Sequence, residues 1–337
     1  MPFLWSLLLS AIALSNSVHS YISYVEQLNS NEFYAEPIEG YQSLYTAHAQ
    51  ISNIVQKYPG RVKPLQIGTT VKNHPIWAFR ISNPMEIPRH RVLVFAGLHA
   101  MEWMGLDVSL DSLKTLAEHP PPNVEVVIVP WVNIDKRQLV EQDRIHNRLQ
   151  YRRSNMNGVD LNRDYEINRE ATAVWRHFIP HRYTTSPSPL SQPESQAIET
   201  LLSTMSFDAA ISLHSFGGYL YYPWAALYRR VPDRETFVRL GHVMQNAQRG
   251  PYPYRVEQLT HWFFIFRIQG SEIDHMYGKY GIHAFLIELT YTGIRPFDRS
   301  TWKDNFYLYN PKAPELDTQR GVNAVLALCR HYSTIDW

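Results

Sequence analysis

Short, mostly apolar runs alternate with helical patterns along most of the chain. Four runs have the length and character of strands buried on both faces, at 92–96, 124–129, 207–214 and 284–289. Apolar residues at helical spacing predict helices over 44–58, 106–116, 193–205 and 315–332, and a hairpin is predicted from 62–67 and 76–81. With no repeat or linker visible, strands alternating with helices predict a single α/β domain.

A change in the pattern of apolar residues near the N-terminus marks where this domain begins. Residues 4–14 form an apolar stretch of signal-peptide length, and Val18 and Ser20 are small residues suited to cleavage after Ser20. We therefore expect residues 1–20 to be a signal peptide of a secreted or periplasmic protein, although an uncleaved apolar arm fits the same stretch. Residues 21–40 lack a strong period and are expected to form an extended N-terminal arm, leaving 41–337 as the domain.

Composition excludes several classes of protein. The 337 residues are 45% hydrophobic and 19% charged, with a net charge of +1 and no run of Lys or Arg, which argues against nucleic acid as a partner. No segment after the signal is apolar enough to span a membrane. The single cysteine, Cys329, falls in a helical pattern and is expected to be a buried small hydrophobe. Residues 133–192 are polar and lack clear periods, which predicts a functional loop region.

Two candidate metal ligands lie in the turn that follows the first buried run. His99 and Glu102 are three residues apart and come directly after the strand, where open α/β sheets bind ligands. His214 ends another predicted strand and completes a His, Glu, His set, which with an open fourth position is the pattern of catalytic zinc. Each residue alone is better explained as an ordinary polar residue at a helix surface or sheet edge. The combination predicts a zinc site.

The segment Asn157-Gly-Val-Asp160-Leu-Asn162-Arg163 supplies groups for a substrate and for a metal ligand. Arg163 can bind a carboxylate through two parallel hydrogen bonds, and Asn162 adds amide donors beside it. Asp160 is spaced to accept a hydrogen bond from the ring N–H of a ligand histidine, which would fix its tautomer. Upstream, Arg152 and Arg153 each offer a cation that could polarise a substrate carbonyl. A polar surface turn explains any one of these residues but not the whole segment.

A carboxylate inside an apolar strand is the candidate base. Glu288 is flanked by Leu286, Ile287 and Leu289, and burial there would raise its pKa towards the range of a general base. The alternative is a structural glutamate held in a salt bridge.

Together these segments resemble the zinc metallocarboxypeptidases, the carboxypeptidase A-like peptidases. The matching stretches lie in family order over residues 41–335: Gly97-Leu-His99-Ala-Met-Glu102-Trp103, Asn157 to Arg163, Ile211-Ser-Leu-His214-Ser215, Ile273-Asp274-His-Met-Tyr277, and Ile287-Glu288-Leu289 with Thr292-Gly293. The resemblance implies a mixed, mostly parallel twisted sheet in an α/β/α sandwich. It implies one zinc ion per chain, held by His99, Glu102 and His214, with Asp160 as the partner of the first histidine.

The resemblance also implies the roles of the substrate-contacting residues. Glu288 would activate water for attack on the last peptide bond of a peptide or protein, and Asn162 and Arg163 would hold the terminal carboxylate. Arg153 is preferred over Arg152 as the residue that stabilises the oxyanion, because its spacing to Asn162 needs no gap.

Three further positions bear on the substrate pocket. Phe266 stands where the family has a tyrosine that caps the substrate, and Ile273 occupies the pocket-floor position that is acidic in relatives that remove basic terminal residues. Phe297 matches an aromatic that lines the same pocket, so an apolar or aromatic terminal residue is expected. Glu272, beside Ile273, could instead attract Lys or Arg.

The sequence therefore predicts a secreted, monomeric zinc exopeptidase. Two alternatives remain: an amidohydrolase of the same fold that acts on cell-wall peptides or acylated amino acids, and a secreted binding protein that has lost catalysis. The presence of all three ligands together with Glu288 argues against the second.

Overall fold

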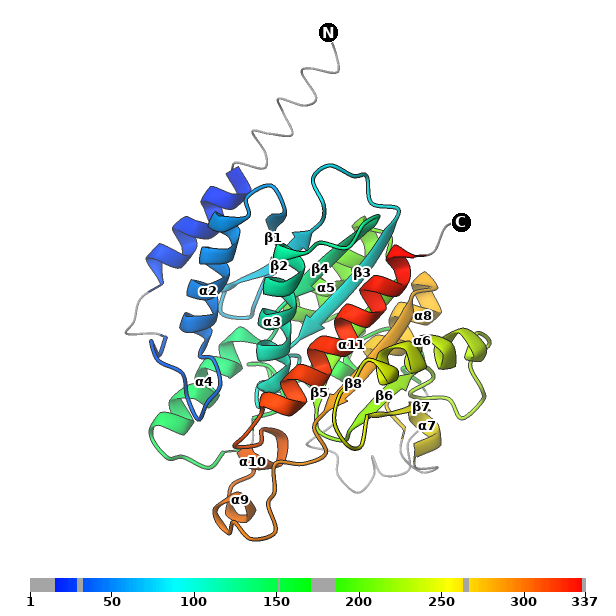
Figure 1. Cartoon of the computed structure of the whole chain (residues 1–337). Coiled ribbons are helices and arrows are strands. Elements are labelled where there is room, and N and C mark those ends of the chain that lie inside the picture. Colours follow the sequence, from blue (N-terminus) through cyan, green and yellow to red (C-terminus); the bar gives the residue numbers. More distant parts are fainter. Residues whose placement is uncertain (1–15, 29–32, 151, 171–185, 263–266, 335–337) are drawn as a thin grey trace.

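The fold is built on one eight-stranded sheet, as seen in a computed structural model that describes residues 16–28, 33–150, 152–170, 186–262 and 267–334 (Figure 1). The strand order is β1-β2-β4-β3-β5-β8-β6-β7. The strands are β1 (Val62–Thr69), β2 (Pro75–Ile81), β3 (His90–Ala96), β4 (Val124–Val129), β5 (Ala209–Ser215), β6 (Tyr219–Tyr222), β7 (Arg255–Gln258) and β8 (His283–Leu289).

The four central strands of the sheet are parallel, and the strands on either side join them antiparallel. Strands β4, β3, β5 and β8 run in one direction, while β2 pairs antiparallel with β4, and β6 pairs antiparallel with β8. Every residue of β4 and β5 is buried, which accounts for their mostly apolar sequences. The predicted mixed, mostly parallel sheet is confirmed.

Helices cover both faces of the sheet. Helices α3 (Met104–Glu118) and α11 (Glu315–Ser333) lie side by side across the near face in Figure 1, whereas α5 (Pro193–Thr204) lies behind the sheet against β1. Helix α3 approaches the sheet closely at Gly105, where an added Cβ would lie 2.9 Å from that of Ala96. This contact fixes the helix that follows the turn of His99 and Glu102. The other helices are α2 (Leu44–Lys57), α4 (Ile134–Ile145), α6 (Arg234–Asn246), α7 (Leu259–Trp262), α8 (Glu272–Tyr280), α9 (Ser300–Lys303) and α10 (Phe306–Tyr309), with a 3-10 turn at Leu161–Arg163.

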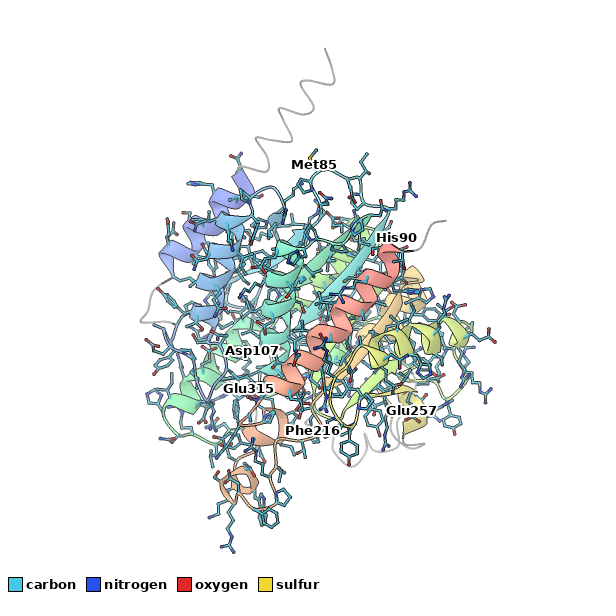
Figure 2. The ribbon with its side chains drawn as sticks, in the orientation of Figure 1. Met85, His90, Asp107, Phe216, Glu257 and Glu315 are labelled. Atoms are coloured by element: carbon cyan, nitrogen blue, oxygen red, sulfur yellow. The ribbon has the colours of Figure 1, made fainter. Side chains whose placement is uncertain are left out.

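The carboxyl ends of the central parallel strands meet at one edge of the sheet. Figure 2 shows Phe216, just past the end of β5, at this end of the molecule, and Met85 and His90 at the opposite end. The side chains predicted to carry chemistry follow these strand ends. None of the helices among the described residues is both long and apolar enough to pass through a bilayer.

The N-terminal arm is not wholly extended, which corrects the prediction for residues 21–40. Residues 16–27 form a helix whose Tyr21 is fully buried. Val18, Val25 and Leu28 pack against the same core, at spacings from Tyr21 that match one face of a helix. This period was missed because it crosses the predicted boundary after Ser20. Residues 1–15, most of the predicted signal, lie outside the described part of the chain.

The polar segment 133–192 contains a helix that the sequence did not reveal. Helix α4 begins at Ile134 and carries few apolar residues, so its period is weak. Instead it buries an ion pair between Arg137 and Glu141. The guanidinium of Arg137 also lies 3.6 Å from the ring centroid of Trp103, the residue after Glu102. A helix that buries charged pairs gives no apolar stripe to recognise.

Candidate active site

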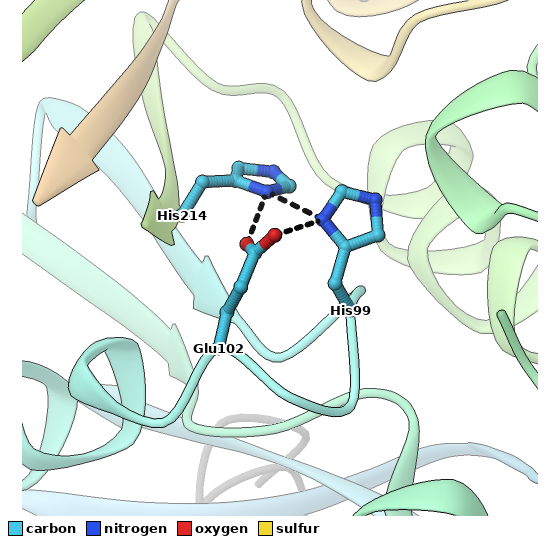
Figure 3. Close-up of side chains that lie close together, drawn as sticks. All are labelled: His99, Glu102 and His214. Atoms are coloured by element: carbon cyan, nitrogen blue, oxygen red, sulfur yellow. Dashed lines mark hydrogen bonds and ion pairs between the residues drawn. The ribbon is translucent and has the colours of Figure 1, made fainter. Parts of the chain in front are cut away.

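Three side chains from two strand ends converge on one point (Figure 3). His99 and Glu102 come from the turn between β3 and α3, and His214 is the penultimate residue of β5. The Nδ1 atom of His99 lies 2.8 Å from Glu102 Oε1 and 3.1 Å from His214 Nδ1, which is 2.9 Å from Glu102 Oε2. All three side chains are buried. The structure thus brings together the three predicted ligands, and among the described residues it brings together no other such group of His, Cys, Asp and Glu.

The far nitrogens of both rings contact carboxylates. His99 Nε2 lies 3.0 Å from Asp160 Oδ1, as the sequence predicts, and His214 Nε2 lies 3.1 Å from Glu272 Oε1. A carboxylate accepts a hydrogen bond from a ring N–H, so in the neutral rings a proton on Nε2 leaves the Nδ1 lone pair facing Glu102. Two nitrogen lone pairs and the oxygens of Glu102 can then bind one cation. The composition of this set fits zinc.

Arg153, rather than Arg152, lies at this cluster. Its Nε donates to Asp160 Oδ2 over 2.9 Å and one terminal nitrogen lies 3.4 Å from Glu102 Oε1. Arg152 pairs instead with Asp143, on the last turns of α4. Burial acts to raise the pKa of Asp160, but the charges of Arg153 and Arg163 more than offset it and hold this pKa well below its usual range.

The two residues predicted to bind a terminal carboxylate lie in the 3-10 turn that follows Asp160. Asp160 caps this turn by accepting from the backbone N–H of Asn162 over 3.0 Å. Asn162 Oδ1 accepts from the backbone N–H of Glu272 over 3.3 Å, which leaves its amide N–H groups to point elsewhere. Both Asn162 and Arg163 are 2% exposed, so the turn is a rigid support close to the metal ligands.

Glu288 lies beside the metal ligands and borders a cavity. It is the register partner of His214 on the neighbouring parallel strand. Among the described residues, its Oε2 is buried without a hydrogen-bond partner, and its carboxylate borders a cavity of about 420 Å³. Burial, followed by the negative charge of Glu102, raises the pKa of Glu288 to about 8 in the metal-free protein. The cavity is otherwise lined by Phe216, Gly217, Tyr219, Tyr221, Leu259, Ile268 and Tyr291.

None of the described positions predicted to shape the substrate pocket borders this cavity. Ile273 is fully buried in α8 and Phe297 is fully exposed, and neither borders the cavity next to Glu288. Glu272 is also fully buried, against His214, so its carboxylate is not directed at a basic substrate side chain. Phe266 lies outside the described residues.

Several supporting residues were not found from sequence. The backbone N–H of Ser215 donates to Glu102 Oε2 over 3.2 Å. Asn310 hydrogen-bonds to the backbone on both sides of Glu102. Its amide donates to Met101 O and its oxygen accepts from Trp103 N, each over 2.8 Å. Asn310 is separated from this turn by more than 200 residues, and only an alignment or a structure would reveal that pairing.

Comparison with known proteins identifies the class of protein that this fold and site define. Residues 47–319 match the profile of the zinc carboxypeptidase family. Because the match covers most of the chain, the chain belongs to the zinc carboxypeptidase family, a class of metal-dependent hydrolases, and zinc is the metal that the family and the ligand set imply.

Individual relatives are distant. The chain is 24% identical to carboxypeptidase A6 of Mus musculus over 83% of its length, and 22% identical to mast cell carboxypeptidase A of Mus musculus over 70%. These alignments span 67% and 60% of the relatives' own lengths. Among solved structures, bovine thrombin-activatable fibrinolysis inhibitor, solved in complex with a tick carboxypeptidase inhibitor, superposes with a TM-score of 0.71 at 19% identity, covering 87% of this chain and 98% of that one. Carboxypeptidase A from Helicoverpa armigera gives 0.70 at 19% identity, covering 97% and 80%. These likenesses establish the fold.

Proposed function

We propose that the chain removes C-terminal residues from peptides and proteins, with a preference for apolar or aromatic terminal side chains. The observation that carries the proposal is the position of Glu288. It is the register partner of the ligand His214 and it also borders a cavity lined mainly by aromatic and aliphatic side chains. A base, a metal site and an apolar recess therefore adjoin one another.

Each residue of the site would have a separate role in hydrolysis. His99, Glu102 and His214 would hold zinc, which when bound supplies a Lewis acid and lowers the pKa of water. Glu288 would accept a proton from the attacking water and pass it to the leaving amine. The metal's positive charge would keep its pKa below the value of about 8 found without metal, so that it is ionised near neutral pH. Arg153 would stabilise the negative charge that develops on the carbonyl oxygen.

Restriction to chain ends follows from the turn at Asn162 and Arg163. The guanidinium of Arg163 and the amide of Asn162 can bind a free carboxylate, which only the last residue of a peptide presents. The side chain of that residue would enter the cavity of about 420 Å³ beside Glu288, which suits Phe or Leu better than a charged group. The engagement of Glu272 by His214 further disfavours Lys or Arg.

We also propose that the chain is exported, with cleavage after Ser20, and that it acts as a monomer. Cleavage at this point would make Tyr21 the first residue of the mature chain. The buried Tyr21 side chain supports retention of everything from that residue onward.

A mixed pool of peptides tests the activity. The protein is incubated with free and C-terminally amidated peptides, with and without a chelator, and released amino acids are identified by mass spectrometry. We expect Phe and Leu to be released from free C-termini only, and chelation to abolish release. Release of Lys or Arg would overturn the preference, and zinc binding without any release would favour an amidohydrolase.

A further inference from the structure

Glu272 contacts the metal-ligand cluster from outside the family motifs. It is the first residue of α8 and is fully buried. Its Oε1 lies 3.1 Å from His214 Nε2, and its Oε2 accepts from Ser271 Oγ over 3.2 Å. A carboxylate removed from water at this depth requires a charged or hydrogen-bonding partner. The imidazole of His214 is the partner that the structure supplies.

The neighbouring hydroxyl of Ser212 makes this carboxylate decisive for the tautomer of His214. Ser212 Oγ lies 2.9 Å from the same Nε2, and a hydroxyl can either donate to it or accept from it. With Ser212 alone, the ring could carry its proton on Nδ1, which faces Glu102 and would then be unable to bind a metal. The Glu272 carboxylate, 3.1 Å from Nε2, adds an acceptor at this nitrogen, which favours a proton on Nε2 and leaves the Nδ1 lone pair facing the cluster.

The surroundings of Glu272 fix its carboxylate in place. At the start of α8 it lies at the positive end of the helix dipole. The helix is itself anchored, because Asp274 accepts from the backbone N–H groups of Ala225 and Ala226 over 2.6 and 3.2 Å. The backbone N–H of Glu272 also holds Asn162 Oδ1, so one residue supports both the metal ligand and the substrate-binding turn.

We propose that Glu272 is a positioning residue that orients His214 for zinc, as Asp160 orients His99, so that each ligand imidazole is backed by its own buried carboxylate. The inference rests on the proposed metal site. Removing such an outer partner weakens metal binding roughly 10- to 100-fold in known sites. Glu272 is therefore assigned to metal retention instead of to recognition of a basic side chain.

Zinc affinity of the Glu272→Gln variant tests the proposal. Glutamine keeps the size of the side chain but loses its charge, and its amide can turn either a donor or an acceptor towards His214. We expect the zinc dissociation constant, measured by competition with a chromophoric chelator, to rise about 10- to 100-fold. Glu199→Gln is the matched control, because Glu199, in α5, pairs over 2.8 Å with the buried His275 of α8. We expect the zinc affinity of this variant to stay within about twofold of the wild type.

Two further measurements separate a positioning role from a structural one. Thermal unfolding of the metal-free proteins shows whether Glu272→Gln is folded. Histidine ¹⁵N NMR of the zinc-loaded wild type should place the proton of His214 on Nε2, and the His214 signals should shift in Glu272→Gln but not in Glu199→Gln. Wild-type zinc affinity in a folded Glu272→Gln would overturn the inference while leaving the proposed activity intact. A wild type that binds no zinc would overturn the proposed activity itself.

Discussion

At the scale of single residues, the site depends on which atoms can accept a proton. Asp160 and Glu272 offer acceptors to the far nitrogens of the two histidines, whose near nitrogens face Glu102. Glu288 stands apart from this arrangement. Its Oε2 has no hydrogen-bond partner among the described residues, which fits its proposed role as the proton acceptor.

Glu288→Gln separates catalysis from metal binding. Glutamine fills the same space beside the cavity but cannot accept the proton of the attacking water, so we expect kcat to fall by roughly 10²- to 10⁴-fold. Because Glu288 is not among the converging metal ligands, zinc content should stay at one per chain. Turnover on a C-terminal Phe peptide and zinc analysis are measured together. Glu315→Gln, at an exposed position of α11, is the control, and near-normal turnover in Glu288→Gln would rule out its role as the base.

At the scale of elements, most strands could be predicted because burial on both faces leaves a mostly apolar run of strand length. Strands β6 and β7 were not predicted, since each is only four residues long and lies towards the edge of the sheet. Helix α4 was missed because it buries charged side chains, and the helix over 16–27 because it crosses the predicted cleavage point.

The helix over 16–27 should contribute measurably to stability through Tyr21. The Tyr21 ring packs edge-on against Trp77 and Phe79 at centroid distances of 5.1 and 5.0 Å, and its hydroxyl lies 3.1 Å from His48 Nδ1. We expect Tyr21→Ala to lower the free energy of unfolding by about 3–5 kcal/mol and Tyr21→Phe by about 1 kcal/mol. Urea unfolding measures both. The exposed Glu26→Ala is the control, and an equally small effect of Tyr21→Ala would show that this helix is not docked in solution.

The contact between this helix and α2 should also be sensitive to acid. Burial, followed by the charge of His74, lowers the pKa of His48 to about 3 from an unfolded value near 6.5. As the pH falls below about 6.5, His48 is protonated in the unfolded chain but stays neutral in the folded chain, so the free energy of unfolding decreases. Between pH 7 and pH 5 the loss is about 2 kcal/mol. The free energy of unfolding, measured at both pH values, should change by about 2 kcal/mol less in His48→Gln than in the wild type. An equal change in both proteins would indicate that His48 titrates normally.

At the scale of the whole molecule, the sequence predicted the metal ligands but not the residues that support them. Local motifs revealed His99, Glu102 and the segment from Asn157 to Arg163, because their spacing is short. The partners Glu272 and Asn310 come from distant parts of the chain, and only the fold places them beside the ligands. The expected pocket positions Ile273 and Phe297 do not border the cavity beside Glu288, because a motif does not encode where a distant helix or loop will lie.

Because the site joins β3, β5, α8 and the turn at Asp160, zinc should stabilise the entire fold. A cation held by His99, Glu102 and His214 binds only the folded chain, in which these side chains converge, and so shifts the equilibrium towards the folded state. With free zinc at about 1,000 times its dissociation constant, the gain is about 4 kcal/mol. Calorimetry of zinc-loaded and chelator-treated protein should therefore show a higher Tm with zinc. His214→Ala should lose both its zinc and this shift, whereas the off-site His275→Gln should retain both. A Tm independent of zinc in the wild type would mean that these residues do not form a metal site.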